Sequence, residues 1–279
     1  MNLLNILQQI EQVDGEVYER LNPRRKAMQQ FASFGQKVAL ASIPLALGSM
    51  FKTAYAQNST ADVEGVLQFA LTLEYLEAEF YTRAVASPLL IPAGAAIGAI
   101  TTIRDHENQH VAFLKTALQS LGKIPVNKPT FDFSAGKGTN AGPFADVFLN
   151  YDTFLAVAQT FEDTGVRAYK GQAAALVGQG AVLTAALNIH SVEARHASHI
   201  RQMRKARGAN VKPWITGKDT GIGDVVQASY NGEEIDSQGG IKITGINGQA
   251  ISLGAATESF DEPLTKEEIL AIVSPFIVS

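Results

Sequence analysis

The stretches Glu107-Asn108-Gln109-His110 and Glu193-Ala194-Arg195-His196 carry the same Glu-x-x-His motif. On a helix, residues three positions apart lie on one face, so each motif can present a carboxylate and an imidazole to one metal ion. A lone glutamate precedes each motif at a similar distance, Glu74 by 33 residues and Glu162 by 31 residues. The sequence therefore predicts a site for two metal ions.

Each pair of glutamates is centred on a segment that interrupts a helix. The midpoint of the first pair falls within residues 87–92, which include two prolines, and the midpoint of the second falls within residues 177–180, which include two glycines. In an antiparallel helical hairpin, residues equidistant from the turn lie at the same level. We therefore expect two hairpins, each of which brings its two glutamates together.

A tyrosine follows each lone glutamate by seven residues, Tyr81 after Glu74 and Tyr169 after Glu162. Seven residues are about two helical turns, so each tyrosine lies on the same stripe as its glutamate. The second half of the chain thus repeats the first, with an offset of 88 residues for these four positions and of 86 for the two motifs. We expect both tyrosines either to hydrogen-bond ligating carboxylates across the bundle or to pack in the core.

This pattern resembles the ferritin-like superfamily, in which two helices carry one Glu each and the other two carry Glu-x-x-His. The resemblance covers residues 60–207, and the tail at residues 260–268 is similar to bacterial ferritin-like domain proteins related to plant desiccation-related proteins. It implies two iron or manganese ions, with no catalytic residue beyond their ligands. The implied ligands are Glu74 and Glu162 as terminal carboxylates, Glu107 and Glu193 as bridging carboxylates, and His110 and His196 as nitrogen ligands.

The chemistry of these residues agrees with such a site. Buried carboxylates are costly unless cations neutralise them, and oxygen and imidazole ligands without sulfur suit iron or manganese. The chain has no cysteine, which excludes thiolate sites. Glu77 competes with Glu74 for the ligand role, but its counterpart in the repeat is Gly165, so Glu74 is preferred.

Other histidines admit alternative interpretations. His106-Glu107-x-x-His110 also matches the zinc metalloprotease pattern, which requires a third ligand and would leave the second Glu-x-x-His motif without a role. His190 and His199 flank the second motif, and we expect either partly exposed positions or hydrogen bonds to ligands.

Apolar residues recur at helical spacing over residues 63–86, 95–121, 144–177 and 181–207. Residues 122–143 contain several prolines and glycines and lack this spacing. The predicted fold is all-α: a ferritin-like four-helix bundle within residues 57–207, with a long crossover between its second and third helices.

Residues 208–279 are expected to form an irregular C-terminal appendage. A small β-hairpin or an ordered arm is predicted there from residues 241–244 and 249–253, which flank an Asn-Gly turn. Thr265-Lys266-Glu267-Glu268 is a capping box that predicts a short last helix.

Residues 1–56 resemble a signal segment. Arg24-Arg25 precedes an uncharged run at residues 38–51, too short for a membrane helix, and Ala54-Tyr55-Ala56 suits a cleavage site before Gln57. We expect export to the periplasm, which involves transient contact with the export machinery. The paired arginines resemble the signal of the twin-arginine route. The alternative is an uncleaved segment that associates with a membrane surface.

The formal net charge of -4 argues against nucleic acid as a partner. The expected function is redox activity of a dinuclear iron or manganese centre toward oxygen or peroxide, as in a ferroxidase or oxidase. Two alternatives stay open: a manganese catalase-like activity, and a non-enzymatic envelope or stress protein with a structural metal site. The sequence also permits a homo-oligomer.

Overall fold

The computed structural model describes residues 62–278 of the 279-residue chain. The expected signal segment, residues 1–56, and the expected mature start at Gln57 lie outside the described residues. Within the described range, none of the helices combines the length and the hydropathy that a membrane span requires.

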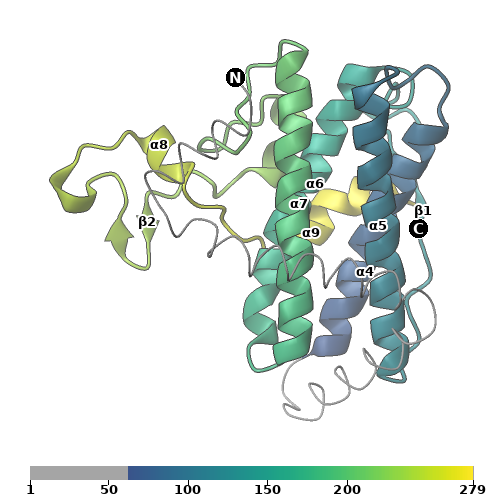
Figure 1. Cartoon of the computed structure of the whole chain (residues 1–279), viewed down its shortest axis with the longest axis horizontal. Coiled ribbons are helices and arrows are strands. Elements are labelled where there is room, and N and C mark those ends of the chain that lie inside the picture. Colours follow the sequence, from purple (N-terminus) through teal and green to yellow (C-terminus); the bar gives the residue numbers. More distant parts are fainter. Residues whose placement is uncertain (1–61, 279) are drawn as a thin grey trace, which may run out of the picture. The chain divides into compact units, whose positions relative to one another are not determined.

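Four long helices make up the bundle: α4 Val63–Ala86, α5 Ala95–Ser120, α6 Tyr151–Ala173 and α7 Gly180–Ala206. Figure 1 shows them side by side, with their axes close to parallel. Each helix buries an apolar face, as the spacing of its apolar residues predicts. The predicted all-α class and its four-helix bundle are confirmed.

Side chains at the helix starts explain where two of these helices begin. Asp62 caps α4 by accepting a hydrogen bond from the Gly65 amide, and Asn150 caps α6 by accepting from the Asp152 and Thr153 amides. The sequence pattern placed the start of this third helix at Phe144. Residues 143–149 instead form turns, because the extended backbone of Asn150 separates them from the helix that it caps.

The helices pair as two hairpins, α4 with α5 and α6 with α7. The second hairpin turns through the short 3-10 helix η1, Ala174–Leu176, and Gly178. Gly178 has a φ of 88°, in the left-handed region that favours glycine. Both turns lie where the midpoints of the glutamate pairs predict them.

The crossover between α5 and α6 contains no α-helix, as its sequence predicts, but it is ordered by two sets of contacts. Strand β1, Thr130–Phe131, pairs antiparallel with β4, Ile277–Val278, near the C-terminus. The carboxylate of Asp132 accepts hydrogen bonds from the amides of Ser134, Gly138 and Asn140. The crossover and the end of the chain therefore support each other.

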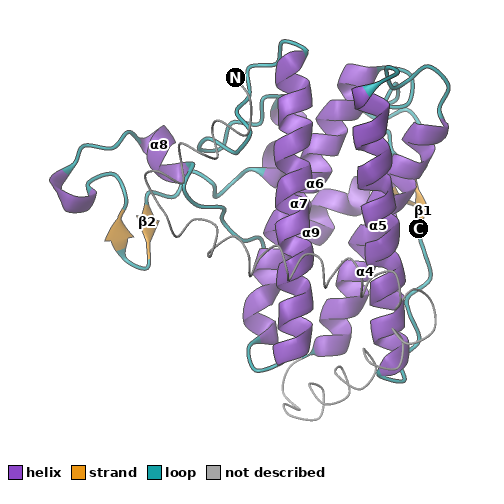
Figure 2. Cartoon of the chain, in the orientation of Figure 1, coloured by secondary structure: helices purple, strands orange, loops and turns teal. Residues whose placement is uncertain are grey.

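The segment after α7 is mostly irregular (Figure 2). Its elements are η2 Asp224–Ser229, β2 Ser237–Gln238, β3 Ile241–Lys242, η3 Ile246–Gly248, α8 Leu253–Thr257, α9 Lys266–Val273 and η4 Ser274–Phe276. The predicted capping box of Thr265 and Glu268 is present at the start of α9.

A small hairpin is present, and its strand β3 lies within the first predicted strand, residues 241–244, but the second predicted strand was wrong. Strand β3 pairs with β2 across Gly239 and Gly240, whose φ angles of 55° and 83° suit a two-residue turn. Residues 249–252 of the second predicted strand form neither strand nor helix, and α8 begins at Leu253, where Ser252 caps it by accepting from the Ala255 amide. Two adjacent glycines thus form the turn in place of the Asn-Gly pair.

Arg167 of α6 fastens the C-terminal segment to the bundle. Its side chain is 1% exposed and donates hydrogen bonds to the carbonyl oxygens of Ser229, Asn231 and Glu262. It also forms a buried ion pair with Glu233, at 2.8 Å. The described part of the appendage and the bundle belong to one compact unit.

Candidate metal centre

The four helices bring the six predicted ligand residues together in the core of the bundle. The glutamates are 0% exposed, and His110 and His196 are 9% and 5% exposed. They come from α4 (Glu74), α5 (Glu107 and His110), α6 (Glu162) and α7 (Glu193 and His196).

One group of ligand atoms surrounds His110. Its Nδ1 lies 3.2 Å from Oε2 of Glu74, 3.2 Å from Oε2 of Glu107 and 3.2 Å from Oε1 of Glu193. Each of the four residues offers an atom within 4.8 Å of the others. This spacing could hold one metal ion.

A second group surrounds His196. Its Nδ1 lies 2.9 Å from Oε1 of Glu107, 3.3 Å from Oε2 of Glu162 and 3.9 Å from Oε2 of Glu193. These four residues also offer atoms within 4.8 Å of one another. Glu107 and Glu193 belong to both groups, which is the arrangement that two bridging carboxylates require.

Several ligand atoms lack the hydrogen bonds that burial demands. Within the described residues, Oε1 of Glu107, Oε2 of Glu162, both carboxylate oxygens of Glu193 and Nδ1 of His196 are buried without a hydrogen-bond partner. Unpaired buried polar atoms of this kind are costly and rare. The atoms without partners are oxygens and a nitrogen, with no sulfur among them. This set of donor atoms suits iron or manganese ions.

The metal-free site compensates its charge by holding protons. Burial raises the pKa of Glu74 to about 7 and also raises the pKa of Glu193. Burial opposes the charge of His196, but Glu162 and Glu107 outweigh it and raise its pKa to about 11. Glu107 is likewise buried, yet the neighbouring imidazoles of His110 and His196 lower its pKa to about 2. Without bound metal, an imidazolium at His196 would therefore offset part of the carboxylate charge.

Each tyrosine of the repeat supports the lone glutamate of the other hairpin. The Tyr81 hydroxyl donates to Oε1 of Glu162 at 2.5 Å, and the Tyr169 hydroxyl donates to Oε1 of Glu74 at 2.5 Å. Burial raises the pKa of both tyrosines, so both remain protonated donors. The second oxygen of each glutamate faces the histidine of its own group.

His106 is a residue of this site that the sequence did not reveal. Its Nδ1 lies 2.9 Å from Nε2 of His196, and the two rings stack with centroids 5.2 Å apart. This contact fixes the ring of His196 with Nδ1 toward the carboxylates. His106 is absent from both ligand groups, so the arrangement gives no support to the zinc metalloprotease pattern. The only signal in the sequence was its position four residues before His110.

Glu77 is a fifth buried carboxyl beside the centre. It is 4% exposed and belongs to neither ligand group. Burial and the neighbouring carboxylates, Glu193 first, raise its pKa well above the usual value. A Cβ atom on Gly165 would lie 3.2 Å from Oε1 of Glu77, so the glycine at the repeat-related position leaves room for this side chain.

The two histidines that flank the second motif, His190 and His199, belong to neither ligand group. Nδ1 of His190 is 3.1 Å from the carbonyl oxygen of Val166, and His199 is exposed. Asp163 forms a buried ion pair with Arg201 at 2.5 Å and accepts a hydrogen bond from Tyr230.

The fold and the ligand geometry agree with the comparisons. No curated protein and no solved structure matches the chain significantly. A family model described as a ferritin-like domain matches residues 62–206, which is more than half of the chain. This range begins at the residue that caps α4 and ends at the last residue of α7. The chain therefore belongs to the ferritin-like domain family.

Proposed function

We propose that this protein is a dinuclear iron or manganese carboxylate protein with redox activity toward oxygen or peroxide. The observation that carries the proposal is the pair of ligand groups that share Glu107 and Glu193. Each group combines one imidazole nitrogen with carboxylate oxygens, a donor set that suits both metals.

The charge of the site supports two ions. The four glutamates of the two groups carry four negative charges when ionised, which two divalent cations neutralise. With a single divalent ion, protons would have to neutralise the remaining two charges, because uncompensated charge in the core is strongly destabilising. The buried oxygens without partners belong to Glu107, Glu162 and Glu193, and the two shared glutamates place such oxygens in both groups, which favours a cation in each.

Two bound Fe(II) or Mn(II) ions would supply two electrons, enough to reduce O2 with two protons to hydrogen peroxide, or hydrogen peroxide with two protons to two waters. The protein's own residues hold and orient the ligands. Tyr81 and Tyr169 fix the lone glutamates, and His106 fixes His196. Burial of the glutamates keeps bulk water from the carboxylates.

Anaerobic loading with Fe(II) tests this proposal. Admission of oxygen or peroxide should produce near-ultraviolet ferric absorption in the wild-type protein. His110→Ala and His196→Ala should suppress it, whereas His199→Ala should not, because His199 is exposed and outside both groups. A loaded wild-type protein that both oxidants leave unchanged would contradict redox activity.

The same protein loaded with manganese distinguishes the alternatives. Evolution of oxygen from peroxide would support the catalase-like activity. A fully loaded protein that is inert with either metal would favour a non-enzymatic envelope or stress protein in which metal stabilises the fold.

We further propose that the chain is exported to the periplasm and that residues 1–56 are removed, on the basis of the signal-like sequence before Gln57. Mass spectrometry of the N-terminus in the native host tests this. A chain that begins at Met1 or Asn2 would favour a retained segment.

A further inference from the structure

An apolar cavity lies about one helical turn from the metal centre, at the end of the bundle that contains η1. On three helices, a residue that lines the cavity is four positions from a ligand, or about 6 Å along the axis. These residues are Ala70, before Glu74; Leu114, after His110; and Ile189, before Glu193.

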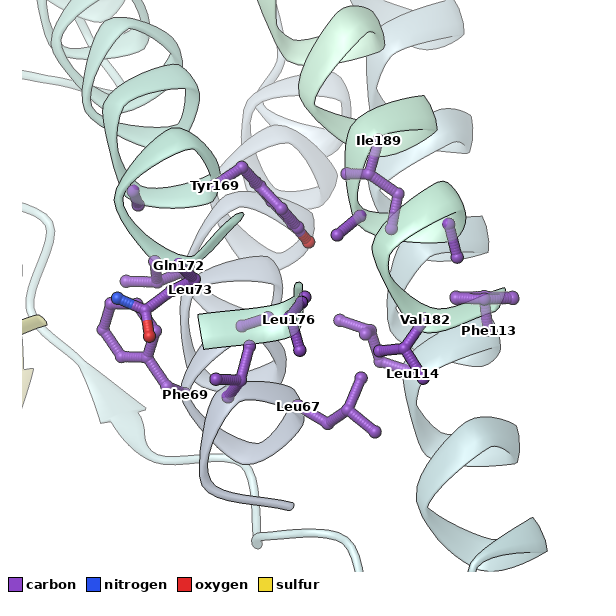
Figure 3. A pocket seen from close by; sticks show the side chains of 15 residues that line it. Leu67, Phe69, Leu73, Phe113, Leu114, Tyr169, Gln172, Leu176, Val182 and Ile189 are labelled. Atoms are coloured by element: carbon purple, nitrogen blue, oxygen red, sulfur yellow. The ribbon is translucent and has the colours of Figure 1, made fainter. Parts of the chain in front are cut away.

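Tyr169 connects the cavity to the centre. Its side chain lines the cavity, and its hydroxyl donates the 2.5 Å hydrogen bond to Glu74. Figure 3 shows the Tyr169 ring at the cavity together with the apolar side chains of Leu67, Leu114, Val182 and Ile189. A molecule in the cavity would therefore be separated from a ligand of the first group by one side chain.

The size and lining of the cavity limit its occupant. The space open to the centre of a water-sized sphere is about 20 Å³, which suffices for one small molecule. The lining is almost entirely apolar, and Gln172 is partly exposed. Enclosed apolar cavities stay dry and accept small apolar molecules such as xenon. Most side chains that line this cavity are buried, and Phe113, Gln172, Ala185 and Ala186 are partly exposed.

The internal repeat shows why the cavity exists. Three lining residues, Val66, Leu73 and Ala168, are offset by 88 residues from Phe154, Phe161 and Phe80 in the other half. The rings of these phenylalanines pack together beside Tyr81, with centroids of Phe80 5.0 Å from Phe154 and 5.1 Å from Phe161. At these three positions, aromatic rings fill one end of the repeat, and aliphatic side chains leave space at the other.

We propose that this cavity holds dioxygen and supplies it to the Glu74 side of the metal centre. The proposal rests on the redox function proposed above and names its oxidant. Dioxygen is small and apolar, and it gives up no strong hydrogen bonds when it enters a dry cavity. Hydrogen peroxide would lose hydrogen bonds to water without replacing them, and an aliphatic chain needs far more space.

Xenon provides a test that is independent of activity. Crystals of the metal-loaded protein under xenon pressure should show xenon between Leu67, Leu114, Val182 and Ile189. Leu73→Phe and Val66→Phe, which copy the filled end of the bundle, should each exclude it. An ordered water at this position, or no xenon in the wild-type protein, would overturn the proposal. Two variants are used because either ring could prevent folding.

Oxidation rates test the link to the centre. With Fe(II) bound, the ratio of the O2-driven to the peroxide-driven rate should fall about tenfold in the two phenylalanine variants. Ala112→Phe, which adds the same ring on the exposed face of α5, should keep the wild-type ratio. A ratio that stays unchanged after xenon is excluded would overturn the proposal.

The wild-type protein distinguishes failure of the proposed redox function from failure of the cavity proposal alone. If neither oxidant oxidises its bound iron, the proposed redox function fails, and the role of the cavity in supplying dioxygen fails with it. If both oxidants act and only the ratio fails to change in the variants, the redox function stands and the cavity proposal alone is wrong.

Discussion

Tyr81 and Glu162 link the two hairpins of the bundle through a hydrogen bond of 2.5 Å from the tyrosine hydroxyl to Oε1. Tyr169 makes the reciprocal bond to Glu74. Each hairpin therefore positions a predicted metal ligand of the other, and the geometry of the centre depends on how the hairpins pair.

Tyr81→Phe should weaken metal binding about 10- to 100-fold, because hydrogen-bond partners orient ligating carboxylates. Titration against a competing chelator measures the change. Tyr151→Phe is a matched control, since the Tyr151 hydroxyl is buried without a hydrogen-bond partner within the described residues. Equal effects of the two substitutions would show that the hydroxyl of Tyr81 does not position Glu162.

The two shared glutamates should matter most for metal stoichiometry. Glu107→Gln and Glu193→Gln should each prevent loading of two metals per chain, because each residue belongs to both ligand groups. Glu77→Gln should retain both metals, since the raised pKa of Glu77 already favours its neutral form. Elemental analysis decides the outcome. If Glu77→Gln loses metal and Glu74→Gln does not, the assigned face of α4 is wrong.

Metal affinity should rise with pH. His110 and His196, whose pKa values are both raised in the metal-free site, must each lose a proton to bind metal, so affinity should increase about tenfold per pH unit for each proton released. Below about pH 7 the slope should become steeper, because Glu74 is then also protonated in the metal-free state. Titrations from pH 6 to pH 9 in a non-chelating buffer measure this dependence. An affinity independent of pH would contradict the protonated metal-free site.

The sequence predicted the bundle well because its signals are local. Helical spacing located α4, α5 and α7 to within a residue or so at each end, and the hairpin midpoints brought Glu74 level with Glu107. The helix bounds and the matching levels of the glutamates both follow from the fixed geometry of a helix.

Contacts between distant segments could not be read in the same way. The pairing of His106 with His196 depends on how α5 and α7 are rotated toward each other. The pairing of β1 with β4 involves only two residues in each strand, too few to leave a pattern. The cavity also depends on packing, although the repeat does mark the small residues, such as Ala168, that form it.

Arg167→Leu should destabilise the protein by about 3–5 kcal/mol, because it leaves Glu233 buried without its partner. Burial raises the pKa of Glu233 to about 7 even beside Arg167, and loss of the arginine should raise it further. When folding raises the pKa of a carboxyl group, the protein loses stability as pH increases from the pKa of that group in the unfolded state to its pKa in the folded state. Denaturant unfolding should therefore show a larger loss at pH 8 than at pH 5.

Arg104→Leu provides the comparison for this prediction, since the ion pair of Arg104 with Asp105 is largely exposed. It should change stability by less than about 1 kcal/mol. Similar losses for the two variants would contradict the fastening role of Arg167.

Anomalous diffraction from crystals loaded with Fe(II) or Mn(II) tests the central claim most directly. The account predicts two metal peaks inside the bundle, one bound by His110 and the other by His196, with Glu107 and Glu193 in contact with both. A single peak, or none among these residues after loading, would contradict a dinuclear centre.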